Sequence, residues 1–104
     1  MIKEVCVENF TNVPLMIERG ADRIELNNDL SVGGTTPSFG VIKKTVEYTH
    51  KHDVPVIVMI RPRGGNFVYS EDELEIMIND IQICSLLGLI ITITGTSCLC
   101  VYST

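Results

Sequence analysis

The stretch GADRIELN at residues 20–27 decides the fold class of this 104-residue chain. A glycine suited to the end of a helix comes first. In the segment after it, Ile24 and Leu26 alternate with Arg23, Glu25 and Asn27. Because successive side chains of a β-strand point to opposite faces of a sheet, this pattern predicts a strand with one apolar face and one polar face.

The surrounding sequence repeats a strand followed by a helix three times. Strands are expected at residues 1–7, 23–26 and 54–60, and helices end at Gly20, begin near Thr36 and begin at Ser70. Alternation of this kind is typical of parallel strands joined by crossover helices. Two architectures fit it: an open sheet with helices on both faces, or the start of a (β/α)8 barrel.

The polar strand face favours the barrel. Glu4 and Cys6 share one face of the first strand, and Glu25 lies on the polar face of the second. Helices on both sides of an open sheet require two apolar faces, whereas a barrel can gather polar groups toward one end of its interior. We predict an α/β fold of the (β/α)8 TIM-barrel type. Met59 and Arg61 would join the inner face, which brings Arg61 near both glutamates.

The third helix has the clearest start signal in the chain. Ser70 and Glu73 have the spacing of a capping box, and acidic residues fill the first turn. Apolar positions then recur at intervals of three and four, which predicts one buried face: Leu74, Met77, Ile78, Ile81 and Cys84.

Charge and cysteine content exclude several classes of protein. The net charge is −5 and aromatic residues make up 6% of the chain, so a nucleic-acid partner is not expected. Four unevenly placed cysteines do not form a secreted disulfide framework, which indicates a cytoplasmic setting. No charged residue follows Asp80, but polar residues and glycines interrupt this uncharged stretch, so no membrane anchor is expected.

Five motifs together resemble the CutC family, which is named for copper homeostasis. They are EVCV at residues 4–7, GADRIEL at 20–26, GGTTPS at 33–38, MIRPRGG at 59–65 and FVYS at 67–70. The resemblance implies a cytoplasmic (β/α)8 barrel of a little over twice this length that forms a homo-oligomer and handles copper. It also implies that Cys6 is a candidate Cu(I) ligand and that Glu4, Glu25, Arg61 and Arg63 lie at the barrel mouth.

One residue departs from the family pattern. Many relatives place a second cysteine where this chain has Asn27, and an amide is a poor ligand for Cu(I). Two-thiolate copper binding within one chain is therefore not expected. Cys6 could instead be a small buried hydrophobic residue. Metal binding is less expected still at His50 and His52, near a helix end, and at Cys98 and Cys100.

The residues also support a second function, an enzyme acting on a small anionic or phosphorylated metabolite. Arg61 and Arg63, with the backbone of Gly64 and Gly65, could receive a phosphate or carboxylate. The alternative for Arg61 is an ion pair with Glu4 or Glu25. Those two glutamates are candidates for acid–base catalysis if their environments separate their pKa values.

The resemblance is expected to end at Gly88. The resemblance implies a barrel truncated to about three βα units plus a partial fourth strand. Residues 1–88 are then the amino-terminal part of the barrel, and residues 89–104 an aberrant uncharged tail. A premature end through a shifted reading frame would explain the tail, because codons for residues 88–90 can encode Val-Asp in another frame. The chain would then be an inactive truncation, and the coding DNA would test this.

Overall fold

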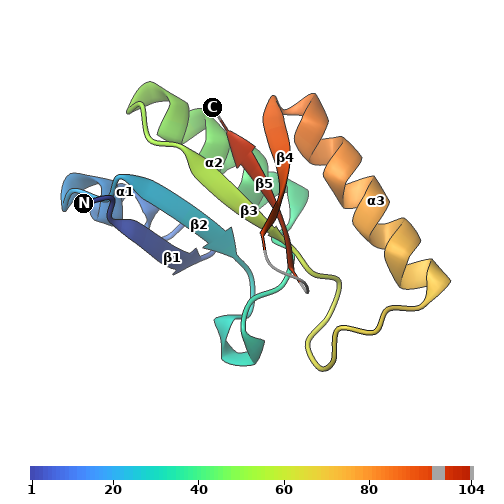
Figure 1. Cartoon of the computed structure of the whole chain (residues 1–104). Coiled ribbons are helices and arrows are strands. Elements are labelled where there is room, and N and C mark those ends of the chain that lie inside the picture. Colours follow the sequence, from blue (N-terminus) through green and yellow to red (C-terminus); the bar gives the residue numbers. More distant parts are fainter. Residues whose placement is uncertain (95–97, 104) are drawn as a thin grey trace.

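A computed structural model describes residues 1–94 and 98–103 of the chain. The amino-terminal part contains three strands, each followed by a helix. Its elements are β1 (Glu4–Glu8), α1 (Val13–Glu18), β2 (Arg23–Asn27), the 3₁₀ turn η1 (Leu30–Val32), α2 (Phe39–Lys51), β3 (Val56–Ile60) and α3 (Glu71–Leu86). Strands β1, β2 and β3 pair in parallel, in that order (Figure 1). The predicted parallel βα units are therefore confirmed.

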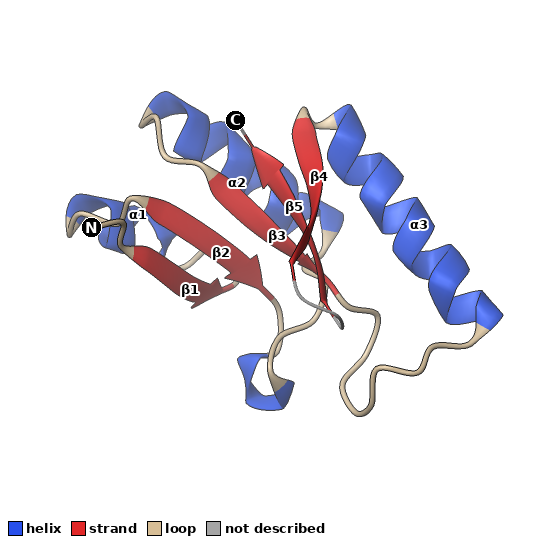
Figure 2. Ribbon diagram, viewed as in Figure 1, coloured by secondary structure: helices blue, strands red, loops and turns tan. Residues whose placement is uncertain are grey.

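The end of the chain forms a β-hairpin rather than a fourth βα unit. Strands β4 (Leu89–Thr94) and β5 (Cys98–Ser103) are antiparallel, and β5 pairs antiparallel with β3 (Figure 2). The sheet order is β1-β2-β3-β5-β4. The predicted fourth strand does form, but it lies at the edge of the sheet and does not continue the parallel order next to β3. Strand β5 thus pairs along the side of β3 that faces away from β2.

The core lies between the helices and one face of the parallel strands. Val7, Ile24 and Leu26 are buried there with alternate residues of β3, and Val13, Ile42 and Val46 supply the helical side. The opposite face of β1 and β2 carries Glu4, Cys6, Arg23 and Glu25, which we call the polar face. The predicted division of these two strands into an apolar and a polar face is confirmed. Helix α3 buries less than predicted, because Leu74 and Ile78 are 47% and 54% exposed.

The helix termini follow local rules. Ser38 caps α2 by accepting a hydrogen bond from the Val41 amide, and Ser70 with Glu73 forms the predicted capping box of α3. Gly20 adopts a positive φ of 93° just before β2, as expected for a helix-ending glycine. Within the described part of the chain, no helix combines the length and apolar character needed to cross a membrane.

Candidate functional site

The polar face is built from two cross-strand pairs. The parallel register places Cys6 opposite Glu25 and Glu4 opposite Arg23. The Cys6 thiol donates a hydrogen bond to Glu25 Oε2 at 3.0 Å, and an Arg23 Nη atom lies 3.3 Å from Glu4 Oε2. Each glutamate therefore has a partner on the neighbouring strand, and Cys6 lies between two carboxylates.

This environment keeps the thiol of Cys6 protonated. Partial burial raises its pKa to about 11, and the hydrogen bond and negative charge of Glu25 and the charge of Glu4 add to the effect. Thiolate, rather than thiol, binds metals and acts as a nucleophile. Any chemistry at Cys6 must therefore remove a proton, and Glu25 is the nearest group that could accept it.

Asn27 is the last residue on the polar side of β2, and it is buried. Its side chain is 1% exposed, and its Nδ2 donates to the carbonyl of Glu25 at 3.2 Å. Gly34, in the loop after η1, packs directly against its amide oxygen. This amide is packed at the end of the strand beside a small cavity, and its Oδ1 accepts no hydrogen bond from the described residues.

Arg61 follows β3 and binds backbone carbonyls. It is 5% exposed, and its guanidinium donates to the carbonyls of Val32 at 2.6 Å, Gly34 at 3.0 Å and Gly65 at 3.0 Å. Its backbone amide donates to Thr36 Oγ1 at 2.8 Å. Arg61 therefore joins the loops that follow β2 and β3 at the carboxyl end of the sheet. The alternative pairing of Arg61 with Glu4 or Glu25 is absent from the described residues, because Arg23 and Cys6 take those positions.

Arg63 fixes the next part of the same loop. Its guanidinium donates to the carbonyls of Gly64 at 3.0 Å, Asn66 at 2.9 Å and Val68 at 2.8 Å, and it pairs with Glu73 at the start of α3. Sequence reasoning found Glu73 as a capping residue but missed this second contact. It also missed the contact between Thr36 and Arg61, because the only sequence signal at Thr36 was its place before a proline.

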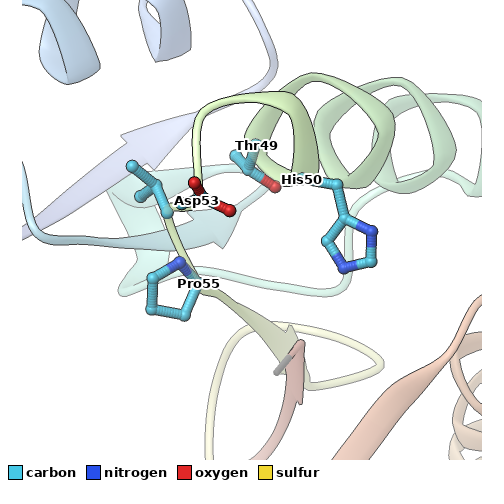
Figure 3. Close-up of a pocket in the computed structure, with 5 residues that line it drawn as sticks. Thr49, His50, Asp53 and Pro55 are labelled. Carbon is cyan, nitrogen blue, oxygen red and sulfur yellow. The ribbon is translucent and has the colours of Figure 1, made fainter.

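Other candidate ligands lie apart from the polar face. His50 and Asp53 line a cavity of about 320 Å³ with Thr49, Val54 and Pro55, around the turn that joins α2 to β3 (Figure 3). Because this turn precedes β3, the cavity lies at the amino end of the strands. His52 instead stacks on Tyr48, with ring centroids 4.4 Å apart. The side chains of Cys98 and Cys100 lie outside the described part. Among the described residues, no group of three or more His, Cys, Asp or Glu side chains could hold a metal ion.

Comparisons with known proteins agree with the sequence motifs. A family model described as the CutC family matches residues 1–99, which extends beyond Gly88. A CutC family protein from Enterococcus faecalis is 57% identical over 88 residues, which are 85% of this chain and 42% of that protein. The human protein named copper homeostasis protein cutC homolog is 47% identical over 87 residues, which are 84% of this chain and 31% of that protein.

A solved structure shows the same fold. The crystal structure of a CutC protein from Streptococcus agalactiae superposes with a TM-score of 0.80 and 48% sequence identity. The match covers 84% of this chain and 41% of that one. The chain thus spans about two fifths of the length of these bacterial relatives.

Proposed function

The chain belongs to the CutC family, and from this premise we propose that it binds Cu(I) through the thiol of Cys6 as part of cytoplasmic copper homeostasis. The observation that carries the proposal is the position of Cys6. It is an exposed soft donor on the polar face, with Glu4 and Glu25 supplying negative charge around it.

Copper binding at this position requires proton transfer. The sulfur–hydrogen bond breaks, a sulfur–copper bond forms, and the proton passes to Glu25 or to water, with no change of oxidation state. Because the thiol pKa is about 11, metal and proton compete at neutral pH. Below that pKa, the apparent affinity for Cu(I) should therefore rise about tenfold for each unit by which the pH increases.

A single thiolate leaves room for a second donor from outside the chain. Asn27 takes the position at which many relatives are expected to have a second cysteine, and it is buried and hydrogen-bonded. Cu(I) on Cys6 would then be shared with a small thiol or with another protein. Such an open site suits a protein that takes up and passes on copper.

Titration with Cu(I) against a coloured Cu(I) chelator tests the proposal. The background should carry Cys98→Ser and Cys100→Ser, so that only Cys6 and the buried Cys84 remain. We expect Cys6→Ser to abolish competition with the chelator, while Cys84→Ser, the matched control, leaves it unchanged. Equal Cu(I) affinity with and without Cys6 would exclude this residue as the ligand.

A second candidate is an enzyme that acts on a small anionic or phosphorylated metabolite. It is favoured by the placement of Glu4 and Glu25 on the same polar face, because two carboxyl groups there could act as acid and base. Arg61 and Arg63 would then support the loops around the metabolite, since backbone carbonyls and Glu73 already occupy many of their donors.

Thermal stabilisation by phosphorylated metabolites would test this second candidate on the Enterococcus faecalis relative. The enzyme hypothesis expects a metabolite that raises the melting temperature and loses this effect when the residue corresponding to Glu25 is replaced. If no phosphorylated or carboxylated metabolite shifts the melting temperature, the hypothesis fails.

A further inference from the structure

A cavity of about 350 Å³ lies between α1 and α2 and belongs to none of the sites described above. Pro14, Ile17 and Glu18 line it from α1, and Tyr48 and His52 line it from the end of α2. Spacings of three and four residues bring the lining side chains of each helix to one side of that helix. We call these five residues the α1–α2 site. Because both helices cover the apolar face of the parallel strands, the α1–α2 site lies on the opposite side of the sheet from the polar face.

Ring contacts fix the aromatic wall of the α1–α2 site. His52 stacks on Tyr48, and Phe10 meets the Tyr48 ring edge-on with centroids 5.7 Å apart. Lys44 Nζ lies 5.2 Å from the centroid of Phe10, so this aromatic cluster already holds one cation of the chain. The faces of aromatic rings attract cations electrostatically. The wall is therefore ordered in advance and suits an apolar group that carries positive charge.

Two of the polar side chains that line the α1–α2 site are hydrogen-bond acceptors. His52 Nδ1 lies 2.9 Å from the carbonyl oxygen of Tyr48. Because a carbonyl can only accept, Nδ1 carries the proton, and Nε2 of the neutral ring is left as an acceptor. Glu18 supplies an exposed carboxylate that forms no ion pair with the residues that the structure describes. A ligand of this site must therefore bring hydrogen-bond donors.

The local charge favours a cation that is not a metal ion. Helix α2 ends at Lys51, beside His52, and the carboxyl end of a helix carries partial negative charge. The carboxylate of Glu18 adds to this, and neither Arg19 nor Lys51 lines the cavity. Glu18 and His52 have no third His, Cys, Asp or Glu with them that could complete a metal site within the described part of the chain. The donors must therefore come from nitrogen on an organic ligand.

We propose that the α1–α2 site binds a small organic cation, with an ammonium or guanidinium group on a short apolar or aromatic body. The nitrogen donates to the Glu18 carboxylate and to Nε2 of His52, and the body packs on Tyr48, Pro14 and Ile17. The volume of the cavity is in the range of small-molecule sites, roughly 300–1,000 Å³. Cu(I) binding at the polar face uses none of these residues, so either proposal can fail without the other.

NMR titration of the whole chain with phenethylammonium tests the proposal. The chain has two histidines, so the ring signals of His50 and His52 can be followed together and assigned with His50→Gln. We expect a saturable shift of the His52 signal, while His50, which lines the separate cavity of Figure 3, keeps its position. Phenethyl alcohol has the same body without the charge and should bind several-fold more weakly. The absence of a saturable His52 shift, or equal shifts at both histidines, would overturn the proposal.

Substitution of Glu18 gives a second test that leaves the fold intact, because this side chain is exposed. Glu18→Gln keeps the size of the side chain and removes its charge. The affinity for phenethylammonium should then fall roughly fivefold, as expected for the loss of an exposed ion pair. Glu47→Gln removes an exposed carboxylate that does not line the cavity, and this matched control should leave the affinity unchanged. Equal affinities of Glu18→Gln and wild type, or equal losses in the two variants, would contradict the assignment of Glu18.

A short peptide separates a free cation from the side chain of a protein partner, since arginine carries the same guanidinium group. The peptide is glycine–arginine–glycine, acetylated and amidated at its ends. We expect phenethylammonium to shift the His52 signal at least as strongly as this peptide at equal concentration. A His52 shift that only the peptide produces would overturn the proposal and assign the site to a protein partner.

Discussion

Asn27 occupies the space that a side chain at position 34 would need. A Cβ atom placed on Gly34 would lie 2.3 Å from Asn27 Oδ1, and Gly34 has a positive φ of 95°. The carbonyl of Gly34 also accepts a hydrogen bond from Arg61 at 3.0 Å. One glycine thus holds the loop after η1 against both the end of β2 and the arginine that follows β3.

Gly34→Ala should destabilise the fold substantially. The new methyl group would overlap the buried amide, and alanine would be held in a backbone conformation that only glycine adopts readily. We expect a loss of about 3 kcal/mol in the free energy of unfolding, measured by urea denaturation.

Gly20→Ala provides the control for backbone strain alone. Gly20 has a similar φ of 93°, but a Cβ atom there would meet nothing within 4 Å. Gly20→Ala should lower the free energy of unfolding by about 1 kcal/mol. Equal losses at the two positions would show that overlap with Asn27 contributes nothing.

Arg61→Lys should also destabilise the fold, although charge is conserved. Lysine cannot reproduce a planar guanidinium that donates to three carbonyls on two loops. We expect a loss of about 3 kcal/mol in the free energy of unfolding, because the buried carbonyl of Gly34 and two partly buried carbonyls would lose a charged donor. Arg19→Lys, at an exposed position, should change stability little in the same urea titration. A small loss at Arg61 would mean that these hydrogen bonds are not required.

The repeat of strand and helix was sufficient to predict the parallel sheet, and the alternation of side chains along β1 and β2 was sufficient to predict the polar face. Burial of Ile24 and Leu26 on one side leaves Arg23 and Glu25 on the other, and this follows from a period of two. The five sequence motifs were sufficient to predict the family, because each combines turn residues with strand residues at fixed spacing. The family match confirms that prediction.

The partners of Arg61 and the pairing of β4 could not be predicted in the same way. Arg61 binds carbonyls of residues 32 and 34, and these contacts depend on the path of a loop rather than on a periodic pattern. A partial fourth strand was predicted, but the place of β4 in the sheet depends on β5. Antiparallel pairing of these two consecutive strands forms locally, whereas a parallel neighbour for β3 requires a crossover connection.

The thiol of Cys6 should react slowly at neutral pH. Because its pKa is about 11, only a small fraction is thiolate at pH 7, and the alkylation rate should rise about tenfold per pH unit up to that value. Glu25→Gln removes one negative charge and replaces a charged acceptor with a neutral one, so it should lower the pKa of the Cys6 thiol and increase the rate at pH 7 several-fold. Iodoacetamide labelling followed by mass spectrometry measures both effects in chains with Cys98→Ser and Cys100→Ser.

Glu18→Gln, on α1, is the control for a general change of charge and should leave the labelling rate of Cys6 unaltered. If Glu25→Gln labels no faster than wild type, the negative charge of Glu25 does not govern thiol reactivity.

Glu73 should make the stability of the chain depend on acid pH. The pKa of Glu73 is lowered below its ordinary value of 4.5. The largest cause is the Ser70 backbone amide, which donates to Glu73 Oε1 at 2.9 Å, and the second is the hydrogen bond from Arg63. A carboxyl group with a lowered folded-state pKa adds stability above its unfolded-state pKa and loses that contribution as pH falls through the folded-state value. Glutamine can still complete a capping box, so Glu73→Gln mainly removes the charge that faces Arg63.

We expect Glu73→Gln to melt at a lower temperature than wild type at pH 7, and the difference to close well below pH 4.5. Circular dichroism melts across this pH range measure the difference, with Glu75→Gln on the same helix as the control. A gap between Glu73→Gln and wild type that stays constant from neutral to strongly acidic pH would show that ionised Glu73 does not stabilise the fold.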